Sequence, residues 1–305
     1  FNYVLPDKIY ADTEMFWERI KVKQIAKAVT EVEMLSEGSD RSHYDREKFI
    51  RVVCISDTHN KHLKIDTKSI PDGDVLIHGG DFTLNGSLGS IKRFAEWFAT
   101  MPHKHKIVIA GNHDMGLDPK AYLKSRLCRA KPNTPEEAAS IMRNTKKKKN
   151  QGEAGGEEKE SNKGKDVCSD EPAFIYLEDE SVQVEGYKFY GSPVTPTFYN
   201  WAFMMDRGPD IRRAWEKIPE DTEVLITHGP PLGQGDLCKG GLRAGCMDLL
   251  HAVQQRVRPL YHIFGHVHEG YGTTTDGLTK YINASTCNYQ YRPVHPAIVF
   301  DLPRK

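Results

Sequence analysis

The sequence lacks three features that would assign it to other classes of protein. The 305-residue chain contains no run of about 18 apolar residues, so we expect no membrane-spanning helix. Net charge is zero, because 42 Lys and Arg residues balance 42 Asp and Glu residues, and this removes any global electrostatic argument for a nucleic acid or membrane partner. The six cysteines include no C-x-x-C pair. In a chain of this length they favour reduced thiols over a disulfide framework, which predicts a cytoplasmic location.

Residues 1–23 also lack the continuous apolar stretch of a secretory signal. The chain begins with Phe1 rather than Met, so its native N-terminus can be incomplete and any targeting segment upstream is not visible in it.

What the sequence does have is a polar group that can bind a divalent cation at the end of each of five apolar runs. The runs are rich in Val, Ile and Leu and predict buried strands at 51–56, 74–78, 105–110, 223–227 and 261–264. Loops converge at the C-terminal ends of such strands, and small-molecule sites form there. The segments that follow are Asp57-Thr58-His59, Gly80-Asp81, Gly111-Asn112-His113-Asp114, Thr227-His228-Gly229 and Gly265-His266-Val267-His268.

The side chains in these segments predict a site for two metal ions. Asp, His and Asn ligands without a thiolate suit Mn, Fe, Zn or Co, with Mn favoured, more than a structural zinc. Two ions roughly 3.5 to 4 Å apart need a bridging carboxylate, and Asp81 is the natural candidate. We assign Asp57, His59, Asp81 and His268 to one ion, and Asp81, Asn112, His228 and His266 to the other.

With these residues the chain resembles the calcineurin-like metallophosphoesterase superfamily, whose pattern is D-x-H, G-D, G-N-H-[DE], H and G-H-x-H. All five elements occur in order, and the resemblance covers about residues 50–301. Further matches, including His228-Gly229-Pro230-Pro231 and Gly191-Ser192-Pro193, are similar to the metallophosphoesterase-domain-containing branch of animals. The resemblance implies a fold of two packed mixed β-sheets flanked by helices, a four-layer sandwich. Spacing alone leaves a single doubly wound sheet open.

His113 is not needed as a ligand in this assignment and is the candidate catalytic residue. A phosphodiester anion repels hydroxide until cations neutralise it and lower the pKa of bound water toward about 7. We therefore expect hydroxide to attack phosphorus in line while His113 protonates the leaving oxygen. Many superfamily members orient this histidine with an Asp three residues after the G-D carboxylate, but Leu84 stands at that position here. The sequence therefore does not identify the group that orients His113. It also leaves open that His113 only supports a metal ligand. We expect His78 to be packed or to support a ligand rather than to bind metal.

The segment 197–203 is the candidate substrate contact. Phe198 and Trp201 could stack on a nucleobase and Arg207 could contact phosphate, beside Asn112 and His113, although a plain core cluster is an equal alternative. The branch resemblance implies phosphodiesterase activity on cyclic nucleotides, including 2',3'-cyclic ones. A phosphoprotein or phosphomonoester phosphatase and a nucleotide-binding regulatory or scaffold protein remain alternatives. The expected partner is thus a small phosphodiester or nucleotide, with no membrane and no strong nucleic-acid signal, and protein partners are unknown.

The chain is expected to divide into an N-terminal helical extension, residues 1–48, and a catalytic domain, residues 49–305. Helices are predicted at 87–100, 207–217 and 243–257, and further strands at 174–177, 181–184, 188–190, 279–283 and 297–301. Within the domain, residues 145–170 contain almost no apolar side chain and predict a disordered insertion.

Overall fold

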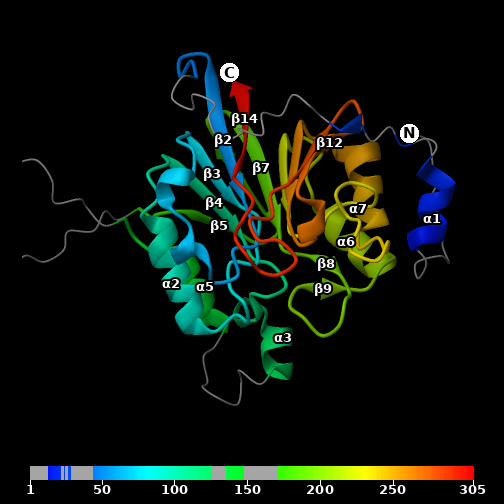
Figure 1. Cartoon of the computed structure of the whole chain (residues 1–305), viewed down its shortest axis with the longest axis horizontal. Coiled ribbons are helices and arrows are strands. Elements are labelled where there is room, and N and C mark those ends of the chain that lie inside the picture. The colour runs from blue at the N-terminus through cyan, green and yellow to red at the C-terminus, as the bar shows by residue number, and fades with distance from the viewer. Residues whose placement is uncertain (1–12, 22–23, 25–26, 29–43, 126–134, 148–170) are drawn as a thin grey trace, which may run out of the picture.

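Two mixed β-sheets packed face to face form the centre of the protein (Figure 1). The structure is a computed structural model that describes residues 13–21, 24, 27–28, 44–125, 135–147 and 171–305. The five-stranded sheet has the order β14-β2-β3-β4-β5, and these strands span Ile298–Pro303, Phe49–Ile55, Val75–His78, His105–Ile109 and Ile175–Leu177. The seven-stranded sheet has the order β1-β12-β13-β11-β10-β7-β6, and these strands span Lys27–Ala28, Gly272–Thr275, Lys280–Asn283, Tyr261–Phe264, Val224–Thr227, Tyr187–Ser192 and Glu180–Val184.

The central strands are apolar along their whole length because both of their faces are covered. Residues 75–78, 224–227 and 261–264 are buried throughout. Strands that are buried on both faces read as continuous apolar runs rather than as alternating ones. Between the two sheets lies one apolar cluster that includes Val52, Ile77, Ile226 and Ile263.

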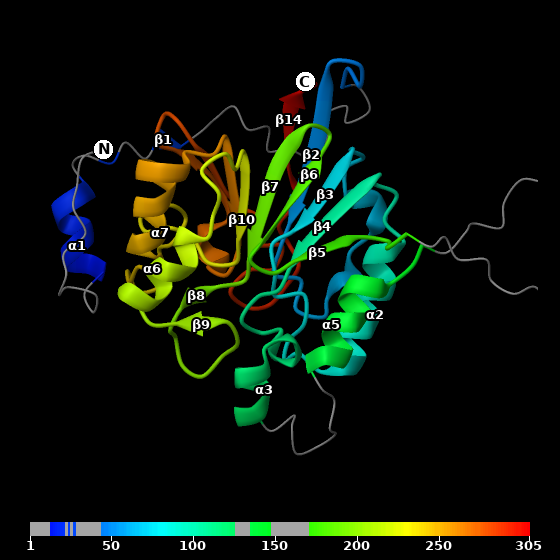
Figure 2. The same cartoon turned by 180° about the vertical axis from the view of Figure 1, so that it is seen from behind.

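Helices cover the outer face of each sheet, as the view from behind also shows (Figure 2). On the five-stranded sheet lie α2 (Leu88–Ala99) and α5 (Pro135–Asn144). On the seven-stranded sheet lie α6 (Pro209–Glu216) and α7 (Met247–His251), which continues as a π-helical segment at Ala252–Val257. The predicted four-layer fold is confirmed. No helix in the described ranges is long and apolar enough to cross a membrane.

Short elements complete the structure around the loops. A two-stranded sheet pairs β8 (Thr195–Pro196) with β9 (Met204–Met205). The helix α3 covers Pro119–Lys124, and 3-10 segments cover His62–Lys64, Thr67–Ser69, Met115–Leu117 and His268–Gly270.

The five ligand-bearing loops meet because their strands run in parallel. The strand β3 pairs in parallel with both β2 and β4, and β10 pairs in parallel with β11. A bridge between Ser56 and Ser285 joins the two sheets at the ends of these strands. The C-terminal ends from both sheets therefore face one region.

The helix α1 (Thr13–Ile20) packs beside α7 and buries Phe16 and Ile20 against Leu232, Met247 and Leu250. Lys27–Ala28 forms the short edge strand β1 beside β12. Residues 1–12, 22–23, 25–26 and 29–43 lie outside the described residues, and so do residues 148–170, which make up most of the predicted disordered insertion.

Candidate metal centre and adjoining pocket

The structure brings the predicted ligands together at the edge where the two sheets meet. Among the described residues, three groups have potential ligand atoms that lie within 4.8 Å of one another, and these groups are Asp57-His59-His268, His59-Asp81-His113 and Asp81-His228-His266. Asn112 joins the last group, with its Oδ1 3.0 Å from His228 Nε2. Asp81 belongs to two of the groups. Its Oδ1 lies 3.3 Å from His228 Nε2 and its Oδ2 lies 3.8 Å from His59 Nε2, as a bridging position requires.

Several of these ligands have a backbone conformation that L-residues rarely adopt. The φ angles of Asp57, His59, Asp81 and His266 are 53°, 40°, 53° and 68°. Positive φ in a residue other than glycine is uncommon, and such strain gathers at functional sites, where the surrounding structure holds it. The backbone is thus turned so that consecutive loops direct their side chains into the same small volume.

Two glycines make room for the carboxylates. A Cβ atom added at Gly111 would lie 2.3 Å from Asp81 Oδ1, and one added at Gly265 would lie 1.9 Å from Asp57 Oδ2. No side chain larger than hydrogen fits at either position unless a ligand moves.

The Gly265→Ala variant should therefore lose metal from the group that contains Asp57. We expect its metal affinity to fall by at least the roughly 10- to 100-fold that follows loss of a supporting partner, measured by elemental analysis after dialysis. Gly89→Ala in α2 is the control, because its added Cβ would make an ordinary 3.5 Å contact with Arg93. Full metal content in Gly265→Ala would show that Asp57 is not a ligand.

Backbone carbonyls fix which nitrogen each histidine presents to the centre. The Nδ1 atoms of His59, His228 and His268 lie 3.3, 3.0 and 2.9 Å from the carbonyl oxygens of Thr83, Gly79 and Asn288. A carbonyl only accepts, so each Nδ1 carries a hydrogen and donates it. In the neutral ring the Nε2 lone pair is then left for the centre, which is the arrangement that metal-binding histidines use.

Atoms that accept hydrogen bonds consequently face one another across the centre. His59 Nε2 lies 3.1 Å from His268 Nε2, and Asn112 Oδ1 lies 3.0 Å from His228 Nε2. Lone pairs at such distances repel unless a proton or a metal ion lies between them. The chain thus presents imidazole, carboxylate and amide donors that fit divalent cations.

The charges in the centre also favour a bound cation. Burial opposes the ionised forms, but the pKa of the Asp81 carboxyl is lowered well below its usual range by the positive charge of His228 and His113 beside it. Burial likewise opposes the charged form of His228, yet Asp81 and Asp57 raise its pKa to about 9. Two buried carboxylates therefore attract positive charge into the centre, and a divalent cation supplies such a charge.

Further side chains hold the ligands in place. Ser285 Oγ donates to Asp57 Oδ2 at 3.0 Å, and the backbone N–H of His266 donates to both oxygens of Asp57 at 3.0 and 3.1 Å. Asp114 accepts from the backbone N–H groups of Gly111 and Thr83, both at 2.8 Å. The sequence pattern did not indicate Ser285, which lies outside every motif.

The open question about His113 has an answer in the main chain. Its Nδ1 lies 2.8 Å from the carbonyl oxygen of Leu84, and its backbone N–H donates to Asp81 Oδ1 at 2.7 Å. The apolar side chain of Leu84 cannot orient His113, but the backbone carbonyl of Leu84 does so. His78 is packed instead, with its Nε2 3.0 Å from Thr58 Oγ1 and its ring 5.0 Å from that of Phe94.

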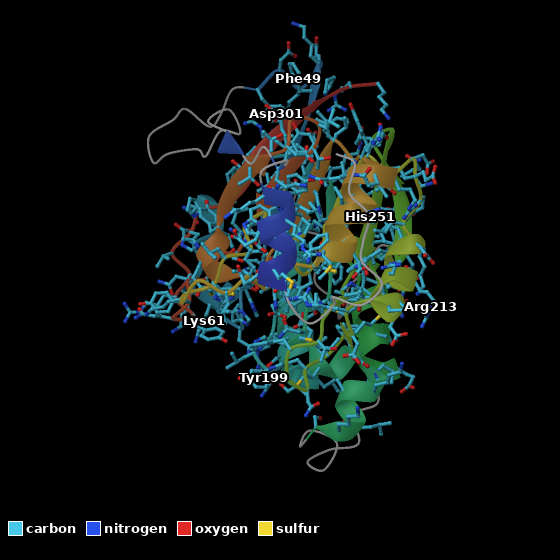
Figure 3. All side chains as sticks on the ribbon, turned by 90° about the vertical axis from the view of Figure 1, so that its right-hand side faces the viewer. Phe49, Lys61, Tyr199, Arg213, His251 and Asp301 are labelled. Carbon is cyan, nitrogen blue, oxygen red and sulfur yellow. The ribbon has the colours of Figure 1, made fainter. Side chains whose placement is uncertain are left out.

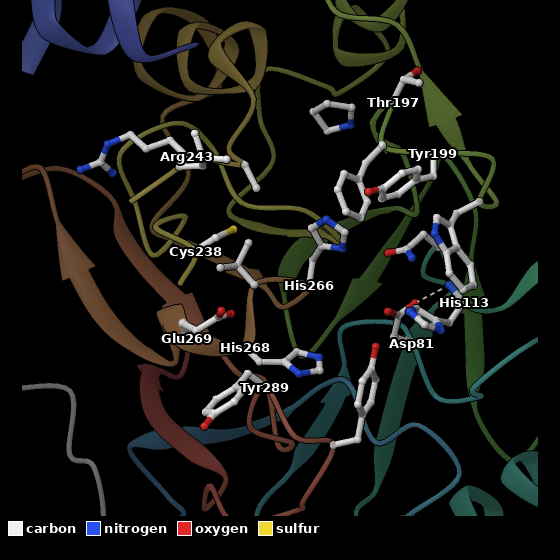
Figure 4. Close-up of a pocket in the computed structure, with 18 of the residues that line it drawn as sticks. Asp81, His113, Thr197, Tyr199, Cys238, Arg243, His266, His268, Glu269 and Tyr289 are labelled. Carbon is white, nitrogen blue, oxygen red and sulfur yellow. Dashed lines mark hydrogen bonds between the residues drawn. The ribbon is translucent and has the colours of Figure 1, made fainter. Parts of the chain in front are cut away.

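A cavity of about 620 Å³ opens on the centre (Figure 4). Metal-ligand candidates and His113 form its floor, and five aromatic residues line its walls: Phe198, Tyr199, Trp201, Tyr289 and Tyr291. Trp201 lies on His113, with ring centroids 4.3 Å apart. The aromatic segment is held there by a bond from the backbone N–H of Ala202 to the carbonyl of Asn112 at 3.1 Å.

The predicted substrate contacts line this cavity, but one of them, Arg207, binds the protein itself. Phe198 is 55% exposed and faces the pocket, so the segment is not a plain core cluster. The guanidinium of Arg207 donates to the carbonyls of Gly245 and Ala244 at 2.7 and 3.1 Å and thereby holds a loop. Tyr289 and Tyr291 were not predicted. Their only signal in the sequence is the spacing of two aromatic residues in a polar segment.

The chain is similar in sequence to known proteins. Residues 50–270 match the family described as calcineurin-like phosphoesterase. Human metallophosphoesterase domain-containing protein 1 is 42% identical over 265 residues, which are 84% of this chain and 72% of the human protein. A Caenorhabditis elegans protein of the UPF0046 group is 36% identical over 307 residues, 99% of this chain and 96% of its own length. A solved Thermus thermophilus structure covers 84% of this chain and 100% of that chain at 12% identity, with a TM-score of 0.47.

Proposed function

Because this chain belongs to the calcineurin-like metallophosphoesterase family and is a metal-dependent phosphoesterase, we propose that it hydrolyses phosphodiesters, and cyclic nucleotides including 2',3'-cyclic ones in particular. The observation that carries the proposal is the pocket, whose aromatic walls stand directly beside the metal centre.

The proposed cofactor is a pair of divalent metal ions, with manganese favoured. Asp57, His59, Asp81 and His268 would hold one ion, and Asp81, Asn112, His228 and His266 the other. When bound, such a pair neutralises the phosphate charge and supplies hydroxide at neutral pH. None of the three ligand groups among the described residues contains a thiol, which favours Mn, Fe, Zn or Co over a structural zinc.

His113 is proposed to deliver the proton to the leaving oxygen. Its ring is fixed by the bond from Nδ1–H to the Leu84 carbonyl, and it lines the cavity next to Asp81. The hydrogen on Nδ1 leaves Nε2 as the atom that can carry and release a proton. A fixed ring with one free nitrogen is what a general acid requires.

The charges of the pocket support a diester over a monoester. A monoester dianion is best met by free guanidinium or ammonium groups, but both arginines that line the described pocket already bind the protein itself. Arg207 binds two carbonyls, and Arg243 Nη1 lies 2.6 Å from Asp236 Oδ1. Glu269 adds a negative charge to the wall. A substrate with a single negative charge and a flat organic group fits this pocket better.

A panel of substrates tests the proposal. Purified, metal-loaded protein should hydrolyse 2',3'- and 3',5'-cyclic nucleotides and bis-p-nitrophenyl phosphate with kcat/KM at least about tenfold above that for p-nitrophenyl phosphate. A preference for the monoester would instead indicate a phosphatase. Binding of nucleotides without turnover of any ester would indicate a regulatory or scaffold protein.

Phe198→Ala should raise KM for cyclic nucleotides and leave kcat nearly unchanged. An aromatic–base stack contributes about 1 to 3 kcal/mol, so KM should rise roughly five- to 150-fold. Phe198 is chosen because this residue is 55% exposed, whereas Trp201 lies on His113. Phe198→Tyr keeps a stacking ring and is the control. Unchanged KM in Phe198→Ala would remove this side chain from the binding site.

A cytoplasmic location is part of the proposal. Its support is that the four cysteines in the described ranges, Cys54, Cys238, Cys246 and Cys287, are free thiols.

A further inference from the structure

We propose that helix α1, which lies outside the catalytic domain, is a positioning element for the substrate pocket: it braces the loop that forms one wall and so sets the pocket's width. The brace consists of Thr13, Glu14 and Trp17, and it acts through Arg243. The inference rests on the proposed function in one respect, because it places the substrate's organic group against that wall.

The wall loop comprises residues 236–245, between β10 and α7. Cys238, Leu242, Arg243 and Ala244 line the pocket. The loop folds back on itself through a bridge between Leu237 and Arg243. At its tip, a Cβ atom added at Gly240 or Gly241 would meet nothing within 4 Å, so the tip itself has little support there.

Fixed points hold the loop on the pocket side. Arg207 donates to the carbonyls of Ala244 and Gly245. The backbone N–H of Lys239 donates to Glu269 Oε1 at 2.9 Å, and Glu269 directly follows the ligand candidate His268. The position of the loop is therefore tied to the edge of the metal centre.

The fixed points on the far side come from α1, and they converge on one residue. The backbone N–H of Arg243 donates to Glu14 Oε1 at 2.8 Å, and its carbonyl accepts from Thr13 Oγ1 at 3.3 Å. The Arg243 guanidinium lies over the Trp17 ring, 4.2 Å from its centroid, while it also pairs with the buried Asp236. Both the main chain and the side chain of Arg243 are thus held by a helix some 230 residues away in sequence.

The side chain of Arg243 points away from the cavity (Figure 4), and α1, drawn in blue, lies on the outside of the molecule (Figure 3). The helix is itself anchored, because Phe16 and Ile20 are buried against Leu232, Met247 and Leu250. Trp17 also packs closely on the loop preceding the wall, since a Cβ atom added at Gly233 would lie 2.1 Å from its Cζ3. A rigid helix therefore transmits its position to the pocket wall.

The consequence is a separation of roles that kinetics can measure. The bonds from Thr13 and Glu14 and the ring contact of Trp17 go to Arg243 of the wall loop, so loosening the brace should leave the chemical step intact. A wall that moves should weaken binding only for substrates large enough to reach it, because positioning by a rigid wall contributes to binding.

The test compares Trp17→Ala with wild type on two diesters that share a leaving group, bis-p-nitrophenyl phosphate and methyl p-nitrophenyl phosphate. For the bulky diester we expect KM to rise about threefold to thirtyfold, the range of a cation–π contact, with kcat within about twofold of wild type. For the methyl diester, KM and kcat should both stay within about twofold. Metal content should match wild type.

Matched variants separate the brace from a general effect on folding. Glu18→Gln is the control on the same helix, because Glu18 is exposed and pairs with Lys21 rather than with the loop. Trp17→Phe keeps a ring under the guanidinium and should restore most of the KM. If Trp17→Ala does not fold, Glu14→Ala removes one partly exposed acceptor and should raise KM for the bulky diester about two- to tenfold.

The outcomes distinguish this inference from the proposed function. A wild-type enzyme that does not favour the bulky diester over the methyl diester would contradict an aromatic pocket for an organic group. If the wild-type enzyme favours the bulky diester and both Trp17→Ala and Glu14→Ala keep that preference, the role proposed for α1 is wrong. The proposed function would then still stand. Equal losses on both diesters, or loss of metal, would also overturn it, since α1 would then support the whole fold.

Discussion

Asp81→Asn should bind well under two metal ions per chain. It should also lose more activity than a variant of any ligand that is assigned to one metal ion only. Asp81 presents one oxygen to His228 Nε2 at 3.3 Å and the other to His59 Nε2 at 3.8 Å, so it belongs to both halves of the centre. The amide carries no negative charge to offset two dications, and it keeps one acceptor oxygen where the carboxylate presents two. Since even an outer partner costs about 10- to 100-fold in metal affinity or activity, the loss here should exceed that range.

Asp57→Asn is the matched comparison. Asp57 belongs to one ligand group, so this variant should keep about one ion where Asp81→Asn disturbs both. Elemental analysis and turnover of bis-p-nitrophenyl phosphate measure the difference. Two tightly held ions in Asp81→Asn would mean that Asp81 is not the bridge.

His113→Ala should keep both metal ions while turnover falls by roughly 10²- to 10⁴-fold on esters with poor leaving groups, the range for lost general-acid catalysis. The reason is geometric: His113 lines the cavity with its Nδ1–H bound to the Leu84 carbonyl, and seven other side chains supply the ligands. The defect should shrink for p-nitrophenyl esters, whose leaving group needs little protonation.

Comparing the two kinds of ester in one variant identifies the role of His113. An equal loss on both would indicate that it binds or positions the phosphate instead. Loss of metal would make it a ligand, which its place in the His59-Asp81-His113 group also allows. His113→Gln is the control for shape, because its side chain still fills the position beside Trp201.

The strands of the core were predictable because burial on both faces leaves a direct trace in the sequence. The run at 261–264 matches β11, and β3, β4 and β10 each differ from their predicted bounds by one residue at one end. The strand β2 begins two residues and ends one residue before its predicted bounds. The strand β12, which lies next to the edge strand β1 and whose residues Gly272–Thr275 are all half-buried, has no such run and was missed. The helix predicted at 243–257 begins only at Met247, because the residues before it belong to the wall loop.

The sequence by itself determined which donor atoms the centre contains and, through the order of its motifs, the family. Side-chain chemistry and its place at the end of an apolar run are local properties, so a single chain displays them. The tertiary structure alone decided how those donors are held. The carbonyls that fix His59, His228 and His268 come from Thr83, Gly79 and Asn288, and any residue type could supply them. Arg207 and Arg243 carry charges that the sequence shows plainly, but only folding reveals that the protein's own carbonyls and carboxylate, rather than a substrate, already bind them.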